Sequence, residues 1–447
     1  MEKEKVKFVE GAQKKGIEKE NAEDVFSVME KFALYGFNRS HSAAYSVVAY
    51  QTAYLKAHYP AEYMAAVLTR NLNDIKKITF FIDECKRSGI PVLGPDVNES
   101  QMKFVVNSKG KIRFGLGAVK GVGEAAVEAL VSERKENGNY TGIFDLTRRV
   151  NLRSCNKRCL EALAMAGAFD SFENTHRAQY LFKENNEEAT FIDKAIKHAN
   201  QVAGKNSMSQ HSLFGETADS IIPDPKLPDC EPWSKMEILN KEREVAGIYI
   251  SGHPLEDYKI EIDNFCNTTV NDLDDLKRLK NKDLSFAGIV TSAAHKTTKT
   301  GKPFGSLVLE DYEGSTQLAL FSEDYLKYKH FFNKDSLLFI KARVQPRYHQ
   351  SEQFELKVHS ISLLSEVLAK CVSGITVQMS LSDISEDLID KISKSLKKNT
   401  GLCKIKFAVY DTIEKTSIEL PARKLKVDSA DFLKMISLIP ELKFKLS

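Results

Sequence analysis

Apolar side chains recur at every third or fourth position through the first hundred residues, a spacing that predicts amphipathic helices. The pattern indicates helices over residues 23–37, 42–60 and 61–71, with Pro60 at the boundary between the second and the third. Residues 78–98 continue as a helix that runs into a Gly-Ile-Pro turn and an extended segment. We therefore expect an all-helical N-terminal region.

The next region combines turns with short helices. Residues 103–119 have the pattern of a short hairpin and a helix end, and the turn at 120–123 leads into a second helix. Two more helices are expected near 143–150 and 156–169. Residues 101–165 carry twelve Lys and Arg against six Asp and Glu, so this region is basic.

Residues 284–364 switch to alternating apolar and polar positions with many β-branched and aromatic side chains, which predicts β-strands. Five strands with a helix between the third and the fourth is the order of an OB-fold barrel. The tail from about residue 372 shows a strand–helix–strand–strand–helix order, which predicts one small α+β domain. The expected fold class is a multidomain protein with α and α+β parts.

A chain of 447 residues is too long for one core. Between residue 185 and the barrel, the sequence is first polar and unpatterned, which is the composition of a linker, and then helical again. We predict six segments: a helical region at 1–102, a helix-hairpin module at 103–185, a linker at 186–235, a helical connector at 236–283, the OB-fold at 284–365 and the α+β domain at 366–447.

The net charge, the apolar runs and the cysteines of the chain limit the classes of function that it can have. Net charge is only +3, from 64 Lys and Arg against 61 Asp and Glu, so the charge of the whole chain gives little support for a nucleic-acid partner. No apolar run reaches the about 20 residues that span a bilayer, and the first residues form no signal-peptide core. We therefore expect a cytoplasmic protein with no membrane partner. The seven Cys are scattered, which favours free thiols over a zinc site, and we predict no bound metal.

The turn Lys120-Gly121-Val122-Gly123 is the first motif with a chemical interpretation. Glycines on both sides of an apolar residue allow a tight turn and bring backbone N–H groups to the surface, at the start of a helix whose dipole favours anions. Residues 116–130 resemble the helix-hairpin-helix motif, which holds DNA phosphates without reading bases. We expect the four turn residues to bind duplex phosphates; the alternative is a plain connection between two helices.

One class of enzyme shares this hairpin. Base-excision glycosylases place a catalytic Asp downstream of it, near the position of Asp145 in this chain. We interpret Asp145 as the N-cap of the next helix, because no aromatic pocket for a flipped base is evident in the sequence. The glycosylase alternative is therefore disfavoured.

A second motif, Gln210-His211-Ser212-Leu213-Phe214, lies in the polar linker. A Leu-Phe pair in a hydrophilic stretch has no core to join, so it marks a binding contact or arises by chance. The peptide resembles the one by which bacterial replication proteins bind the sliding clamp, although His211 stands where an aliphatic residue is usual. We predict that these five residues bind the clamp.

The predicted barrel carries cations and rings of the kind that OB-folds use to bind single strands. The predicted single-strand-binding residues are Lys296, Lys299, Lys302 and Phe304 in and beside the first loop, and Arg343, Arg347 and Tyr348 farther along the chain. The alternative is a solvated surface loop, which commonly carries lysines as well.

The most distinctive phrase is Gly-Phe-Asn-Arg-Ser-His-Ser-Ala-Ala-Tyr at residues 36–45. By chemistry alone it belongs to a packed pair of amphipathic helices. It closely resembles the fingers region of the bacterial C-family replicative polymerase, the DNA polymerase III alpha subunit, with Arg39 in place of a Lys. Residues 10–17, 112–124 and 242–255 match that family in the same order, so the resemblance extends over essentially the whole chain.

The resemblance implies that the parent protein is a DNA-directed DNA polymerase, with residues 1–102 as part of its fingers and 366–447 as a partner-binding domain. The implied partners are primer–template DNA, single-stranded template, the beta sliding clamp and the clamp-loader tau subunit. The resemblance also allows a separate proofreading exonuclease subunit as a partner. Arg39 and His41 would face the phosphates of the incoming nucleotide, or else they are ordinary helix-end residues.

The family holds Mg²⁺ with acidic residues of a palm domain, and no Asp-x-Asp pair occurs in the first hundred residues here. We therefore expect the C-terminal portion of the alpha subunit, as a truncated form or the product of a split gene. Such a chain would contain no catalytic residue, would bind no cofactor itself and would be inactive alone. The alternatives are a non-enzymatic DNA- and clamp-binding adaptor and a tRNA-binding protein with the same type of barrel.

Overall fold

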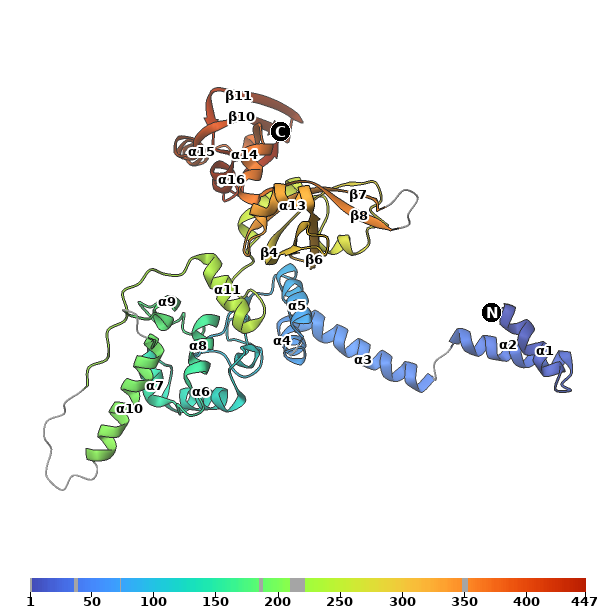
Figure 1. The fold of residues 1–447 in the computed structure, drawn as a ribbon, viewed down its shortest axis with the longest axis horizontal. Coiled ribbons are helices and arrows are strands. Elements are labelled where there is room, and N and C mark those ends of the chain that lie inside the picture. Colours follow the sequence, from blue (N-terminus) through green and yellow to red (C-terminus); the bar gives the residue numbers. More distant parts are fainter. Residues whose placement is uncertain (1, 36–38, 73, 185–187, 210–221, 348–352) are drawn as a thin grey trace. The chain divides into compact units, whose positions relative to one another are not determined.

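The computed structural model describes residues 2–35, 39–72, 74–184, 188–209, 222–347 and 353–447 (Figure 1). Backbone contacts divide the chain into two compact units, which are Met1–Ser251 (unit 1) and Gly252–Ser447 (unit 2). Within the described ranges, no helix is both long enough and apolar enough to cross a membrane.

Unit 1 begins with five helices, of which the apolar spacing indicates all but the first. They are α1 (Glu2–Gln13), α2 (Lys19–Tyr35), α3 (Arg39–His58), α4 (Pro60–Arg70) and α5 (Ile75–Arg87). α1 packs against α2 through Phe8 and Phe26, whose ring centroids lie 5.5 Å apart. Pro60 is the first residue of α4, where its missing N–H removes no helical hydrogen bond.

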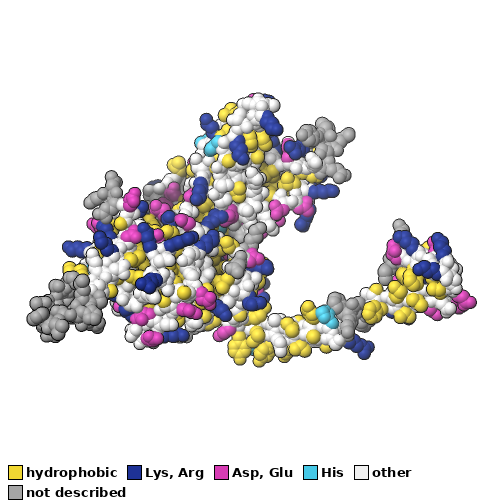
Figure 2. Space-filling view, turned by 60° about the horizontal axis from the view of Figure 1, so that its bottom comes forward, with side chains coloured by type: hydrophobic (Ala, Val, Ile, Leu, Met, Phe, Trp, Pro, Cys, Tyr) yellow, Lys and Arg dark blue, Asp and Glu magenta, His cyan; other side chains and the backbone are white. Residues whose placement is uncertain are grey.

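Helix α3 differs from the packed, amphipathic helix that was expected. None of its residues is buried, and Tyr45, Val48 and Tyr50 are among its exposed apolar side chains (Figure 2). Its apolar residues are spread around the helix, so no single face gathers them. Helix α4 instead buries Met64 and Leu68 in the core of unit 1.

A small sheet and a set of short helices complete most of unit 1. The strands β1 (Val92–Leu93), β2 (Val105–Val106) and β3 (Ile112–Arg113) lie in the order β1-β3-β2. They are followed by the 3₁₀ turn η1 (Leu116–Ala118) and by α6 (Glu124–Asn137), α7 (Ile143–Arg149), α8 (Lys157–Ala166) and α9 (Arg177–Leu181). Side chains such as Leu130, Leu146 and Leu163 join α4 and α5 in one hydrophobic core.

The sequence predicts the end of a helix just before the Gly-Val-Gly turn. The structure forms only the three-residue 3₁₀ turn η1 there. The N–H groups of Leu116 and Gly117 donate to the carbonyls of Gln101 (2.8 Å) and Met102 (3.1 Å). These contacts to the preceding loop replace the hydrogen bonds that would extend a helix backward along the chain.

The predicted linker at 186–235 is wrong over its first part, because a helix, α10, spans Phe191–Ser209. Phe191, Ile192 and Ala195 are buried in the core of unit 1. Only a narrow stripe of the helix is apolar, and the surrounding Lys, Asn and Gln residues concealed that stripe in the sequence.

The predicted helical connector at 236–283 is divided between the two units. Helix α11 (Lys235–Ala246) lies in unit 1, where Val245 and Ala246 belong to the core. The turn η2 (Glu256–Tyr258), helix α12 (Lys259–Phe265) and the turn η3 (Asn271–Asp274) lie in unit 2. Apolar side chains on either side of Ser251 thus join different cores.

Unit 2 contains the predicted OB-fold. Its elements are β4 (Asp283–Thr297), β5 (Pro303–Glu310), β6 (Ser315–Phe321), α13 (Ser322–Tyr328), η4 (Lys329–Phe331), β7 (Leu337–Pro346) and β8 (Phe354–Leu363), and the sheet order is β6-β5-β4-β7-β8. The first half of the long strand β4 pairs with β7, and its second half pairs with β5. The predicted order of five strands with a helix after the third is confirmed.

The remainder of unit 2 is the predicted α+β domain (Figure 1). It contains η5 (Leu364–Glu366), α14 (Val367–Cys371), β9 (Gly374–Ser380), η6 (Leu381–Asp383), α15 (Glu386–Lys398), β10 (Thr400–Asp411), β11 (Thr416–Val427), α16 (Ser429–Ile436) and β12 (Lys443–Leu446). The sheet order is β11-β10-β9-β12. The last strand was not predicted; it pairs antiparallel with β9 through four residues, too few to show a period in sequence.

Candidate nucleic-acid interface

Backbone hydrogen bonds hold the turn between η1 and α6. The N–H of Val122 donates to the carbonyl of Val119 (3.1 Å), and the N–H of Lys120 donates to the carbonyl of Val245 in α11 (2.7 Å). Gly121 has a φ of +90°, which glycine adopts without the strain that a β-carbon would cause. The side chain of Val122 is buried in the core, so the core and α11 together determine the shape of the turn.

The two glycines carry the backbone donors that face solvent. The N–H groups of Gly121 and Gly123 donate to no other residue in the described ranges, and both residues are exposed. Gly123 is the N-cap of the 14-residue helix α6, whose dipole places partial positive charge at the same point. Of the four predicted residues, Lys120 and Val122 use their amides internally, which leaves Gly121 and Gly123 for an anion.

Arg158 of α8 is a cation beside this turn that the sequence prediction missed. A β-carbon placed on Gly121 would lie 3.5 Å from Nε of Arg158, so its side chain runs alongside the glycine. Arg158 is exposed, and it pairs with no residue in the part of the chain that the structure describes. Only tertiary structure brings it to the hairpin, and no local pattern in the sequence could have identified it.

Helix α6 is held by Arg149 of α7, which donates to Glu133 (3.0 Å) and to Asp145 (2.9 Å). The hydrogen bond from Arg149 lowers the pKa of the Glu133 carboxyl. Asp145 is the third residue of α7 rather than its N-cap, which is Gly142, and it also accepts from the N–H of Thr141 (3.0 Å). This carboxylate therefore holds Arg149 in α7, and Arg149 in turn contacts Glu133 of α6.

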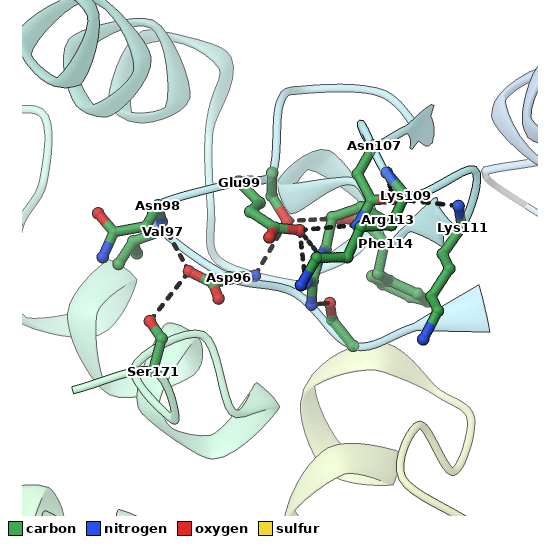
Figure 3. Close-up of polar contacts among 12 residues, drawn as sticks. Asp96, Val97, Asn98, Glu99, Asn107, Lys109, Lys111, Arg113, Phe114 and Ser171 are labelled. Carbon is green, nitrogen blue, oxygen red and sulfur yellow. Dashed lines mark hydrogen bonds and ion pairs between the residues drawn. The ribbon is translucent and has the colours of Figure 1, made fainter. Parts of the chain in front are cut away.

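A polar cluster joins the β2–β3 hairpin to the loop before it (Figure 3). Glu99 accepts hydrogen bonds from Arg113 (2.6 Å) and Asn107 (3.1 Å), and the carbonyl oxygen of the Asn107 side chain accepts from the N–H groups of Lys109 (3.1 Å) and Lys111 (3.0 Å). Burial alone would raise the pKa of Glu99, but the hydrogen bonds from Asn107 and Arg113 outweigh it and lower that pKa.

The same loop is attached to α6. Asp96 accepts from the N–H of Asn98 (2.7 Å) and from the hydroxyl of Ser171 (3.1 Å), as Figure 3 shows. Arg134 of α6 donates to the carbonyl of Ser100 (3.0 Å). Asp96, Glu99, Glu133 and Asp145 are thus engaged in structural contacts around α6, the helix that begins at the turn.

The residues predicted to face a nucleotide lie at the start of α3. Arg39 is its first residue and is exposed, and the ring of His41 lies 4.4 Å from the ring of Tyr45. The role of Arg39 and His41 stays a prediction.

The structure brings four of the predicted single-strand-binding residues together at one end of β4. Lys296 and Phe304 are directly opposite one another on β4 and β5, and Lys299 and Lys302 are exposed in the turn between those strands. That turn is closed by the N–H of Thr298, which donates to the carbonyl of Lys302 (2.8 Å).

The remaining predicted residues do not join this cluster. The strand register places Arg343 opposite Asp283, the first residue of β4, and its Nε lies 3.8 Å from that carboxylate. Arg347 follows the end of β7, and Tyr348 lies outside the described residues. The predicted set is therefore not one cluster.

The predicted clamp peptide, Gln210 to Phe214, lies outside the described residues and stays a prediction. On its C-terminal side, the carboxylate of Asp224 accepts a hydrogen bond from Arg148 of α7 (2.6 Å). Asp224, ten residues after the peptide, is thus held against α7.

Three family models match separate parts of the chain. A helix-hairpin-helix motif model matches residues 89–180, an OB-fold nucleic acid binding domain model matches residues 284–364, and a model of the C-terminal domain of the DNA polymerase III alpha subunit matches residues 375–447. These matches agree with the hairpin module, the barrel and the final domain described above.

Curated relatives match most of the chain. The DNA polymerase III subunit alpha of Escherichia coli O157:H7 is 36% identical over 89% of this chain and 33% of its own length. The corresponding proteins of Haemophilus influenzae and Neisseria meningitidis serogroup B are 36% and 40% identical over 90% and 75% of this chain, respectively. They are covered over 34% and 28% of their own lengths, so the chain spans about a third of the length of these relatives.

Proposed function

Because this chain is related in sequence to the C-terminal part of DNA polymerase III alpha subunits, we propose that it grips DNA within a replicative polymerase. The observation that carries this proposal is the order of three matching modules, a helix-hairpin-helix, an OB-fold and an alpha C-terminal domain, along one chain. An unrelated DNA-binding protein would have no reason to combine all three in this order.

In this proposal the hairpin turn binds duplex DNA. A phosphate oxygen accepts hydrogen bonds from the N–H groups of Gly121 and Gly123, and the α6 dipole adds to the attraction. The side chains of Lys120 and Arg158 supply full positive charges beside the turn. None of these contacts reads a base, as a polymerase that copies every sequence requires.

The barrel in this proposal binds single-stranded template. Lys296, Lys299 and Lys302 attract the phosphates, and Phe304 offers a ring to an unpaired base. We also propose that Gln210 to Phe214 bind the sliding clamp and that the final domain binds the clamp-loader tau subunit. Arg39 and His41 would contact the incoming nucleotide.

The parent activity in this proposal is template-directed addition of deoxynucleotides to a primer end. The described residues contain no group of three or more His, Cys, Asp or Glu side chains that could hold a metal ion. These residues therefore do not fit the Mg²⁺ site of such a polymerase, and we propose that its metal ligands lie outside this chain.

Primer extension separates this proposal from the alternative of an adaptor protein. We expect no incorporation by the purified chain alone, and we expect incorporation when the missing part of an alpha subunit is supplied in trans or fused to it. Nucleotide addition by the chain alone would contradict the assignment of the catalytic centre elsewhere. DNA and clamp binding without any activity in the joined protein would favour the adaptor.

Clamp binding tests the linker peptide directly. We expect the double variant Leu213→Ala and Phe214→Ala to lose most of its affinity for the beta clamp, because the two apolar side chains fill the pocket of the partner. Ser207→Ala, three residues before the peptide, is the matched control. Equal binding by the wild type and the double variant would remove this assignment.

A further inference from the structure

Two aromatic rings stack on each other on the surface of the barrel. Phe304 of β5 and Phe321, the last residue of β6, have ring centroids 5.3 Å apart and planes only 15° from parallel. Phe321 is 55% exposed. Neither ring belongs to the hydrophobic core of the described barrel. We call this pair the stacking platform.

The strand register places a cation in line with the platform. Lys296 lies opposite Phe304, and Phe304 lies opposite Phe321, so the three residues form one row across β4, β5 and β6. Directly opposite residues project from the same face of a sheet. Leu318 and Leu320 are buried, so the alternate residue Phe321 must project outward.

The next row on this face is made of small side chains. Ala294, Ser306 and Ala319 lie opposite one another on β4, β5 and β6. Because these side chains are short, the ring of Phe321 stands higher than the row beside it. A flat group that rests on Phe321 would therefore meet no neighbouring side chain from that row.

From this geometry we infer that the stacking platform binds one unpaired base of a single-stranded nucleic acid. The base lies on the solvent face of Phe321, and Lys296 pairs with a neighbouring phosphate. This inference rests on the proposed single-strand binding by the barrel, and it moves the base contact from Phe304 to Phe321, whose ring Phe304 supports. No hydrogen-bonding group on the platform reads the edge of the base, so every base is accepted. A duplex is excluded, because its bases are already stacked and paired.

Binding of the full chain to two strands of equal length, about 15 nucleotides, tests this inference. One strand is oligo(dT), and the other has the same phosphates but no bases. We expect Phe321→Ala to lower affinity for oligo(dT) by about fivefold or more, since base–aromatic stacking has this size, and to leave affinity for the abasic strand unchanged. Phe321→Trp should bind oligo(dT) at least as tightly as the wild type.

The matched control is Phe80→Ala, which removes an equally exposed ring, 57% accessible, from an aromatic pair in unit 1. It should change neither affinity. Melting curves of all variants show whether the barrel is intact, and Phe321→Leu keeps an apolar side chain at this position without a ring. We expect Phe321→Leu to bind oligo(dT) as weakly as Phe321→Ala.

The results separate the platform from the proposed function. If Lys299→Ala and Lys302→Ala weaken binding of both strands while Phe321→Ala weakens neither, the barrel binds single strands but the platform does not. Equal losses by Phe321→Ala on both strands would also overturn the platform. If none of these substitutions changes binding, the barrel is not the single-strand surface and the proposed function of the barrel fails as well.

Discussion

In the proposed function, the hairpin turn of unit 1 and the barrel face of unit 2 would bind phosphates through two different kinds of donor. The turn offers the backbone N–H groups of Gly121 and Gly123, whose positions depend on a buried core and on a bond from Lys120 to α11. The barrel offers the ammonium group of Lys296, which lies opposite the ring of Phe304 on the neighbouring strand. Backbone donors lose their positions when the packing around them is disturbed. Side-chain donors can be removed by single substitutions without unfolding the barrel.

The largest expected effect comes from the support of α11. The carboxylate of Glu242, fully buried, accepts from Arg177 (2.8 Å) and from the N–H groups of Ile250 (2.7 Å) and Ser251 (2.8 Å). Glu242→Ala removes three hydrogen bonds to a buried carboxylate, although Arg177 keeps its ion pair with Asp170, so we expect unit 1 to lose about 3 kcal/mol of unfolding free energy. This loss is measured by urea titration, with unfolding monitored through the fluorescence of Trp233, the single tryptophan.

The same variant tests whether the hairpin depends on α11. Because Lys120 donates to Val245 of that helix, Glu242→Ala should weaken duplex binding and leave single-strand binding by the barrel unchanged. Glu237→Ala, an exposed change in the first turn of α11, is the control and should cost about 1 kcal/mol or less. Wild-type duplex affinity in the Glu242→Ala protein would show that the turn does not need this support.

The next effect is at the turn itself. Gly121→Val adds a β-branched side chain at a φ of +90° and beside Arg158, so we expect duplex affinity to fall by about tenfold or more through displaced backbone donors. Gly138→Val is the matched control, because Gly138 has a φ of +81° at the far end of α6. Fluorescence anisotropy with duplex and single-stranded DNA measures both. If Gly121→Val and Gly138→Val lower duplex affinity equally, the loss of affinity comes from backbone strain in general and not from the hairpin turn.

A smaller effect concerns the polar support of the hairpin module. The pKa of Glu99 is lowered in the folded protein, so its stabilising effect is present above the unfolded pKa of about 4.3 and is lost as pH falls through the folded pKa. Its side chain is 40% exposed, so we expect less than about 1 kcal/mol. Between about pH 5 and pH 3, Glu99→Gln should lose less stability than the wild type. Parallel pH curves would contradict this assignment.

The smallest expected effect is on the barrel. Lys302→Ala removes one exposed cation from a loop, so single-strand affinity should fall about twofold to threefold and its dependence on salt should weaken by about 0.7 in slope. Duplex binding at the hairpin should not change. Salt titrations with both DNAs measure the slopes. A full loss of single-strand binding would contradict a barrel surface that shares the phosphates among several lysines.

Much of the architecture was predictable because it follows local rules. Helices α2 to α5 follow from three- and four-residue spacing, and the barrel follows from alternation with β-branched residues. Helix α10 was missed because its buried stripe is narrow, and β12 because it is only four residues long. Both elements form through packing on residues far away in the sequence, which local periodicity does not report.

The sequence by itself determined the order of the modules, the glycines of the turn and the presence of cations and rings in the barrel. Tertiary structure decided which of those groups face solvent: it engaged the amides of Lys120 and Val122, brought Arg158 to the turn, and separated Arg343 from Lys296. The physical reason is that a residue type and its spacing express local backbone preference, whereas the availability of a donor depends on which distant groups satisfy it first.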